Sequence, residues 1–267
     1  MATVFAEELT ASEFDNFVGP HTVGVLPVAA IEPHGPHLPL STDCDIARGH
    51  LAHLPEHVDE SHDVLILPLQ TIGLSVEHEG FAGAFSHEPE TLLTVWDDVV
   101  RVFRKAGGRR LIIVSSHGGN SEVASLLVQR LRARHALLAV TAAWLRFGQP
   151  DGLYAPEELS HGIQGGAVEA SLSLHCWAEG VRHDLVADHP SAAESWAANS
   201  LHLSAHGRTR LGWMSRDLNP AAVVGDGLAA SADKGARSAE HALVGFAELI
   251  ADVAGFDLAA LRTEVGR

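Results

Sequence analysis

Residues 23–43 read VGVLPVAAIEPHGPHLPLSTD, and this stretch joins an apolar run to a cluster of polar side chains. The first half is almost wholly apolar and rich in β-branched residues, which predicts a strand buried on both faces of a parallel sheet. The apolar run stops at Glu32, and His34, His37 and Asp43 follow among three prolines. Because residues i and i+2 of an extended segment point to the same side, Glu32 and His34 can converge on one point. The prolines stiffen the loop, which predicts a preorganised metal site, with a solvated surface loop as the alternative.

The composition is that of a globular protein with an acidic balance of charge. Hydrophobic residues make up 46% of the 267 residues, and 18 Lys and Arg stand against 34 Asp and Glu, for a net charge of −16. This negative charge is unfavourable for nucleic acid or an anionic membrane as a partner. The two cysteines, Cys44 and Cys176, are too few for a disulfide framework and favour a reducing compartment. We find neither a secretory signal nor a run of ~18 apolar residues, so we expect a cytoplasmic protein without a membrane span.

Strand patterns alternate with helix patterns along the chain. Strands are predicted over 23–31, 63–69, 111–116 and 137–143, and helices near 11, over 45–57, 90–106, 121–134 and 228–254, and from 165 or 166 onward. Segments 147–164 and 207–227 are predicted to be loops. This alternation predicts an α/β fold, a three-layer sandwich with a mostly parallel central sheet and helices on both faces. Without a linker or an internal repeat, residues 1–267 are predicted to form a single domain.

Two further segments place candidate ligands at the edge of this sheet. The strand at 111–116 runs into the sequence SHGGN, and ligands of open α/β sheets bind at the carboxyl ends of the strands. His117 is therefore a candidate, although HGGN alone is also typical of a simple strand-to-helix turn, with Asn120 or Ser121 as the N-cap. Glu169 lies near the start of the helix that opens at 165 or 166. It either faces a metal or complements the helix dipole.

Histidine is unusually frequent, with 18 residues, as many as Lys and Arg together. His50, His53, His57 and His62 lie in or beside a predicted surface helix, so we expect them to be exposed and without function. Only histidines at strand ends are interpreted as functional.

The segment EPHGPHLPLSTD resembles the E-x-H-G-x-H-L-P-L-x-T-D signature of the creatininase (creatinine amidohydrolase) family. SVEHEGFAGAFS, SHGGN, GGAVEAS and RDLNPAAVVGD extend the resemblance, in order, over nearly the whole chain. The resemblance implies a dinuclear metal centre in which Asp43 bridges two divalent ions. It places Glu32 and His117 on one ion, and His34 and Glu169 on the other.

The resemblance also implies a parallel sheet between helical layers, a homohexamer, and hydrolysis of C–N bonds in cyclic or linear amides with zinc, manganese or iron. The chemistry agrees with the residue types, because carboxylates and imidazoles without thiolates suit these metals. A bridging carboxylate holds two ions about 3.5–4 Å apart, and the pair lowers the pKa of water toward neutrality. The metal-activated hydroxide can then attack the carbonyl of a small-molecule amide.

Two positions depart from the family pattern. Creatininase has a glutamate that binds metal where this chain has Gly119, and HGGN is instead similar to branches that act as peptidases or deformylases. Many members carry a proton-shuttling histidine where this chain has Gln164, which has no titratable proton. His161, Glu77 and His78 remain candidates for the shuttle, and His161 is preferred because it shares a Gly-rich loop with Gln164. Alternative functions are a lactone or keto-ring hydrolase of the same fold, or a metal-binding protein without catalysis.

Overall fold

The computed structural model describes residues 2–206, 209 and 211–261, and its centre is a five-stranded sheet. The strand order is β1-β3-β2-β4-β5, and every neighbouring pair is parallel. The strands are β1 Thr3–Phe5, β2 Val23–Val28, β3 Val64–Ile66, β4 Arg110–Ser115 and β5 Leu138–Ala143. The predicted parallel sheet is confirmed, and β1 is an addition because three residues are too few to show a periodic pattern.

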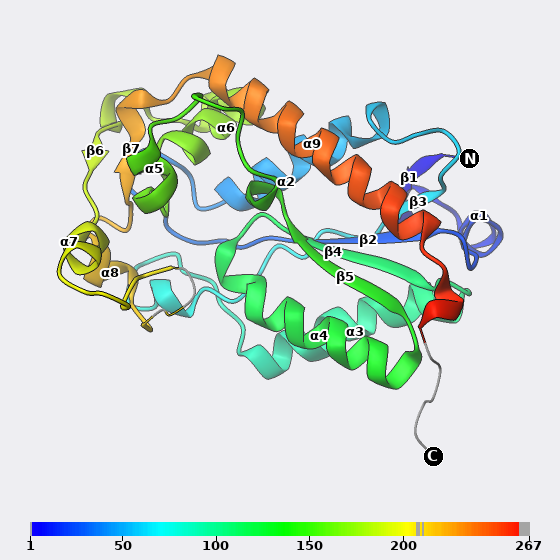
Figure 1. Ribbon diagram of the computed structural model, residues 1–267. Coiled ribbons are helices and arrows are strands. Elements are labelled where there is room, and N and C mark those ends of the chain that lie inside the picture. The colour runs from blue at the N-terminus through cyan, green and yellow to red at the C-terminus, as the bar shows by residue number, and fades with distance from the viewer. Residues whose placement is uncertain (1, 207–208, 210, 262–267) are drawn as a thin grey trace.

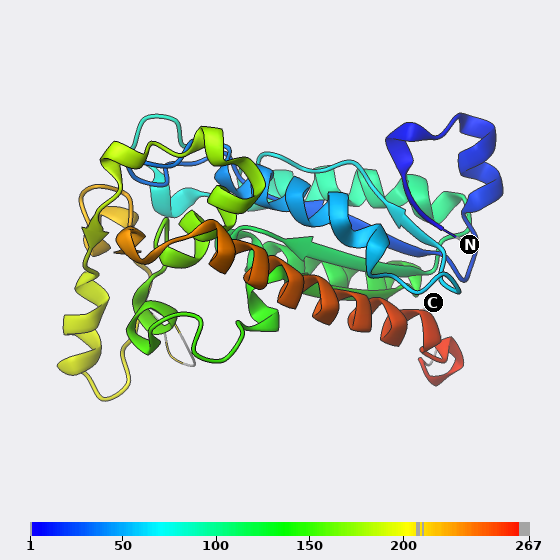
Figure 2. The ribbon, with the colours of Figure 1, turned by 90° about the horizontal axis from the view of Figure 1, so that it is seen from above.

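Helices cover both faces of the sheet, which confirms the three-layer sandwich (Figure 1). One face carries α3 Pro89–Lys105 and α4 Ser121–His135, and the other carries α2 Thr42–His53 and α9 Ala232–Gly255. Figure 2 shows α2 and α9 running along the strands on their side of the sheet. A further helix, α6 Ala167–Trp177, packs against both α2 and α9.

The pleat of β2 explains why the two helical layers have separate cores. All six residues of β2 are buried, and their side chains alternate between the faces of the sheet. Val25 belongs to the core that contains Phe246 of α9, whereas Leu26 belongs to the core that contains Phe103 of α3. Gly24 is needed at its position because a Cβ there would lie 2.9 Å from the Phe103 ring. The strand is therefore buried on both faces, as its apolar run predicts.

Short elements gather beyond the carboxyl ends of the strands, at the left of Figure 1. The segments predicted as loops contain α5 Pro156–His161, α8 Ser215–Leu218 and β7 Gly225–Asp226, and α7 Ala192–Ala198 lies between them in sequence. Strand β7 pairs antiparallel with β6 Asp188–His189. The short lengths of these elements explain why no helical or strand periodicity marks them in the sequence.

The predicted helices are present, and two of their ends matter for the site. The first, α1 Ala11–Phe17, begins with a capping box between Thr10 and Glu13. Helix α2 begins at Thr42, earlier than predicted, so Asp43 lies in its first turn and not in the loop before it. None of the helices in the described residues is long and apolar enough to span a membrane.

The expectation of exposed histidines along 50–62 is wrong for His50. Its side chain is 1% exposed and stacks on Trp144, with ring centroids 4.6 Å apart. His53 is exposed, as expected, whereas His57 and His62 are half-buried. The reason is that α2 packs one of its faces against α6 and α9, and His50 lies on that buried face.

Candidate metal centre

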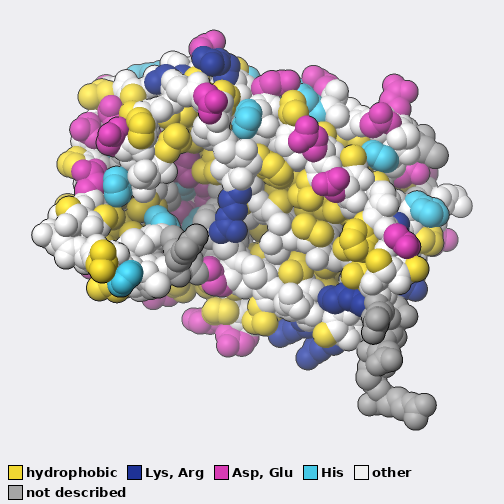
Figure 3. Space-filling view, in the orientation of Figure 1, with side chains coloured by type: hydrophobic (Ala, Val, Ile, Leu, Met, Phe, Trp, Pro, Cys, Tyr) yellow, Lys and Arg dark blue, Asp and Glu magenta, His cyan; other side chains and the backbone are white. Residues whose placement is uncertain are grey.

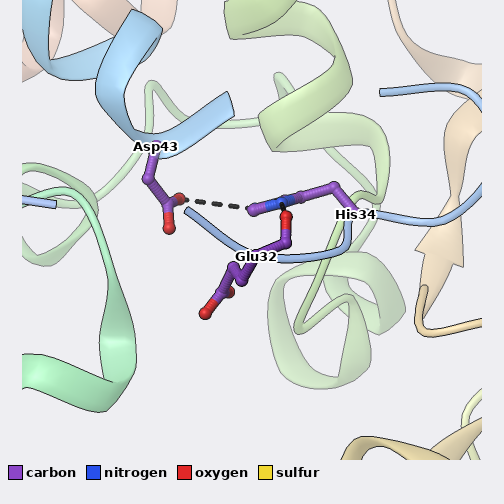
Figure 4. Close-up of side chains that lie close together, drawn as sticks. All are labelled: Glu32, His34 and Asp43. Atoms are coloured by element: carbon purple, nitrogen blue, oxygen red, sulfur yellow. Dashed lines mark hydrogen bonds and ion pairs between the residues drawn. The ribbon is translucent and has the colours of Figure 1, made fainter. Parts of the chain in front are cut away.

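The predicted ligands come from four elements that meet at one edge of the sheet. Glu32 follows the end of β2, and His117 follows the end of β4. Asp43 and Glu169 lie in the first turns of α2 and α6. Figure 4 shows the Asp43 carboxylate and the His34 ring pointing toward each other, with the Glu32 carboxylate nearby. Five residues from three separated stretches of the sequence are therefore brought to one place.

Distances divide the five residues into two groups that share Asp43. One oxygen of Asp43, Oδ1, lies 3.4 Å from His34 Nε2, and the other, Oδ2, lies 3.4 Å from His117 Nδ1. His34 Nε2 is also 3.8 Å from Glu169 Oε2, and His117 Nδ1 is 3.2 Å from Glu32 Oε1. A carboxylate with each oxygen facing a different imidazole has the placement that a bridging ligand requires.

Several of these atoms are buried without a hydrogen-bond partner within the described structure. They are Glu32 Oε2, His34 Nε2 and Asp43 Oδ2. Buried polar atoms are normally hydrogen-bonded, and buried charges are paired or coordinate metals. These unpartnered atoms fit a divalent cation, and their chemistry of oxygen and imidazole donors suits zinc, manganese or iron.

Each imidazole is oriented by its second nitrogen. His34 Nδ1 donates to the carbonyl oxygen of Glu32 at 3.0 Å, and His117 Nε2 donates to the carbonyl oxygen of Leu74 at 2.8 Å. Because a carbonyl can only accept, these bonds fix the tautomer and leave His34 Nε2 and His117 Nδ1 free to bind a metal. The ring orientation is therefore set before any ion is bound.

Burial and neighbouring charge together set the protonation of the centre. Burial lowers the pKa of His34, but Asp43 and Glu169 outweigh it and raise the pKa to about 10. Burial also opposes ionisation of Glu32, yet His117 and His78 lower the pKa of its carboxyl well below the usual value. Burial raises the pKa of Glu169 to about 7 against the effect of His34. The pKa of His117 is also raised, because Glu32 and Asp43 outweigh its burial. Without ions His34 and His117 therefore hold protons, so metal binding is expected to release protons.

Three of the four predicted catalytic residues lie beside the ligands. Glu77 and His78 belong to a 3₁₀ turn, Val76–His78, and His78 Nε2 lies 3.3 Å from Glu32 Oε1. Gln164 Nε2 donates to the same Oε1 at 2.9 Å and to the carbonyl oxygen of Pro33 at 3.0 Å. Gln164 therefore holds the Glu32 carboxylate in place.

The fourth residue, His161, is not brought to this centre. It ends α5 and lines a separate cavity of about 300 Å³, together with Glu157, Asp188 and His189. Its neighbours Ser160 and Gly162 do line the pocket of the metal centre, so the chain passes the pocket while the His161 side chain faces the other cavity.

Asn120 has a different role from the predicted N-cap. It occupies the N-cap position of α4, but its side chain makes no capping bond. Its Oδ1 accepts from Leu74 N at 2.9 Å, and its Nδ2 donates to the Ala29 carbonyl at 3.1 Å and to Ser115 Oγ at 3.3 Å. Asn120 thereby ties together the ends of β2 and β4 and the loop that carries Glu77.

Two of the predicted ligands, His117 and Glu169, line a pocket of about 580 Å³. Its other walls include residues 145–146, 159–160, 162–164, 205–206 and 211–213, and several of these lie in the segments 147–164 and 207–227 that were predicted as loops. Apolar side chains on these walls include Leu145, Leu159, Ile163 and Trp213. Among the described lining residues, Arg146 is the one Lys or Arg, and it donates to Ser121 Oγ at 3.3 Å.

Comparisons with known proteins agree with the creatininase resemblance. The model of the family described as Creatininase, creatinine amidohydrolase, matches residues 7–250. A mycofactocin precursor peptide peptidase of Mycolicibacterium smegmatis is 31% identical over 57% of this chain, so the match spans only about half, 56%, of that protein. A creatinine amidohydrolase of Pseudomonas putida is 29% identical over 71% of this chain and 78% of its own length.

Solved structures share the fold. A crystal structure of creatinine amidohydrolase (creatininase) has a TM-score of 0.73 and 23% identity, covering 95% of this chain and 99% of that chain. A manganese creatininase has a TM-score of 0.71 and 22% identity, covering 94% and 98%. At these identities the structural likeness establishes the common architecture, and the chemistry rests on the residues described above.

Proposed function

We propose, because the chain belongs to the creatininase (creatinine amidohydrolase) family, that it is a metal-dependent hydrolase that cleaves the C–N bond of an amide. The observation that carries this proposal is the Asp43 carboxylate, whose two oxygens face His34 and His117. The unpartnered buried atoms of Glu32, His34 and Asp43 support it, since a cation would satisfy them. That one of the structural neighbours is a manganese creatininase also favours a divalent ion.

The proposed centre holds two divalent ions, zinc, manganese or iron, with Asp43 between them. Glu32 and His117 hold one ion, and His34 and Glu169 hold the other. Such a pair supplies a water of lowered pKa and polarises the amide carbonyl. The chain's own contribution is to fix the ligands, as Leu74 does for His117 through its carbonyl oxygen.

Two other residues are proposed to handle orientation and protons. Gln164 fixes Glu32 Oε1 and so leaves Oε2 for the ion. His78 is assigned the transfer of a proton to the departing nitrogen; burial lowers its pKa to about 4, so at neutral pH it must first accept the proton that it passes on. It lines the pocket, its Nε2 lies close to Glu32, and its Nδ1 has no partner in the described structure. His161 is set aside for this role because it lines the other cavity.

The pocket favours a linear amide over a small ring as the substrate. A cavity of about 580 Å³ lies in the range that buries drug-sized ligands, and its apolar walls suit a substrate with hydrophobic side chains. The M. smegmatis relative is named a peptidase, which agrees with a peptide-like amide. A lactone or keto-ring hydrolase, and a metal-binding protein without catalysis, are the alternatives that an experiment must separate.

Assembly and location stay predictions of the sequence. We propose a single domain over 1–267, assembled as a homohexamer in the cytoplasm. The edge strand β5 is only half-buried along its length, and hydrophobic side chains gather near it between α9 and α4 in Figure 3, which supports a covered surface. The net charge of −16 supports the absence of nucleic acid and of anionic membrane among the partners.

Elemental analysis combined with a hydrolysis screen tests the proposed function. The full chain is stripped with a chelator, reloaded with zinc, manganese or iron, and assayed against linear peptides, N-formyl compounds, lactams and lactones. We expect about two ions per chain and metal-dependent hydrolysis of linear amides. Binding of no divalent ion would refute the metal centre. Two bound ions with hydrolysis of lactones alone would support the lactonase, and two bound ions with no turnover would support the metal-binding protein.

A further inference from the structure

The carboxylate of Glu77 lies inside the centre, although it is outside the five-residue ligand set. Its Oε1 is 3.6 Å from His117 Nε2, the ring nitrogen that donates to Leu74 and not the one left for the metal, and its side chain is 16% exposed. Ligand atoms of Glu32, Glu77 and His117, one from each residue, all lie within 4.8 Å of one another. Glu77 therefore stands beside the half of the centre that Glu32 and His117 form.

Gly119 is what allows this approach. A Cβ at Gly119 would lie 2.6 Å from Glu77 Oε1, 2.5 Å from His117 Nε2 and 2.4 Å from the Leu74 carbonyl oxygen. Carbon atoms do not approach other heavy atoms so closely, so any side chain at this position would displace Glu77 or the His117 ring. Gly119 is not among the glycines with positive φ, so the requirement is for space and not for backbone freedom.

Space beside His117 is thus filled by a carboxylate from another segment of the chain. The creatininase resemblance expects that carboxylate from the position of Gly119. In this chain Gly119 has no side chain, and the turn Val76–His78 brings Glu77 into the space that a side chain at 119 would occupy. The absence of a side chain at position 119 and the presence of Glu77 beside His117 therefore depend on each other.

We propose that Glu77 is a protein ligand of the ion held by Glu32 and His117. The proposal rests on the proposed function, since it assigns a ligand to that metal centre. Charge supports it, because the carboxylates of Glu32, Asp43, Glu77 and Glu169 together balance two divalent cations. Buried carboxylates are stable as ions when a metal or a partner compensates them.

This assignment makes the two halves of the centre unequal. The half with Glu32, His117 and Glu77 has four protein ligands once Asp43 is counted, whereas the half with His34 has three. Closed four-ligand sites are typical of structural zinc, and catalytic zinc keeps an open position. The ion beside His34 is therefore the one with room for water or substrate.

The test measures metal binding by the full-length chain and does not depend on turnover. Chelator-stripped wild type and Glu77→Gln are titrated with Zn²⁺ alone, against a competing chelator. Elemental analysis after desalting gives the ions per chain. Glu157→Gln, which removes an exposed carboxylate at the other cavity, is the matched control. Thermal unfolding of the stripped proteins shows whether each variant folds.

We expect Glu77→Gln to bind one of the two ions at least about 100-fold more weakly, since changes even to residues behind the ligands cost 10–100-fold. Glu157→Gln should bind both ions as wild type does, because its carboxylate lies at the other cavity. Wild-type affinity of Glu77→Gln for both ions would overturn the role of Glu77 and leave the proposed function standing. Absence of Zn²⁺ binding by the wild type would overturn both.

Discussion

His50 makes the stability of the fold sensitive to acid, and its contribution can be separated from that of the other titrating groups by substitution. Its ring is buried against Trp144, its Nδ1 donates to the Ile46 carbonyl at 2.8 Å, and its Nε2 has no partner in the described structure. Burial lowers the pKa of His50 to about 4, with the nearby His175 and His53 adding to it and the Ile46 bond opposing it. The folded state therefore holds a neutral imidazole that must gain a proton in acid.

The sign and size of the effect follow from linkage. The pKa in the unfolded chain is about 6.5, above the folded value, so between these values the unfolded state binds more protons and stability rises with pH. The contribution is fully present above pH ~6.5 and is lost as the pH falls to ~4. At 1.36 kcal/mol per pKa unit the whole loss is about 3 kcal/mol, and roughly 2 kcal/mol of it occurs by pH 5.

Urea unfolding of His50→Phe and wild type at pH 7 and pH 5 measures this contribution. Both proteins are stripped of metal, so the carboxylates and histidines of the centre titrate alike and cancel in the difference. We expect the free energy of unfolding of wild type to fall by about 2 kcal/mol more than that of the variant. His50→Gln, which does not enlarge the side chain, should give the same difference. Equal losses in all three proteins would refute the assignment to His50.

The remaining predictions concern the site and the assembly. Asp43→Ala should lose both ions in elemental analysis and Glu169→Ala mainly one, because only Asp43 faces both halves; full metal content in Asp43→Ala would contradict the bridge. His78→Gln should lower kcat by about 100-fold or more with both ions retained, whereas His161→Ala should leave kcat near the wild-type value. The reverse result would assign proton transfer to His161. Because Arg146 is the one Lys or Arg among the described residues that line the pocket, Arg146→Ala should raise KM for substrates that carry a carboxylate more than for neutral ones. Equal effects on both would contradict a role of Arg146 in substrate recognition. Light scattering should give a multiple of the 28.3 kDa chain, and a mass near 28.3 kDa would refute the oligomer.

The sheet could be predicted from the sequence because its strands are buried on both faces. An uninterrupted apolar run as short as that of β2 is typical of a strand inside a parallel sheet, and the helices between the strands then set a parallel order. The burial of His50 could not be predicted in the same way. It depends on how α2 packs against α6 and α9, and the sequence of α2 alone does not contain that contact.

The convergence of the proposed metal ligands could be predicted from the sequence for a related reason. Glu32 and His117 lie within four residues of the ends of buried strands, and parallel strands bring their carboxyl ends to one edge of the sheet. The candidates for the proton shuttle do not follow a buried strand, so the sheet does not fix their positions. Sequence proximity to Gln164 favoured His161, but the end of α5 directs that side chain to the second cavity. A residue on an unanchored loop can be assigned to a site only when the path of the backbone is known.

Glu77 and Gly119 show that comparing a motif position by position can also miss a residue of the site. Compared position by position, a glycine at 119 indicates a missing ligand and implies a weakened metal site. In space, the missing Cβ is the condition for the close approach of Glu77 to His117, so the carboxylate is relocated and the charge of the centre is kept. A motif defined on one segment cannot record such an exchange, because the compensating residue lies on another. The metal affinity of a family member with HGGN should therefore be inferred from the carboxylates that surround the imidazole in three dimensions.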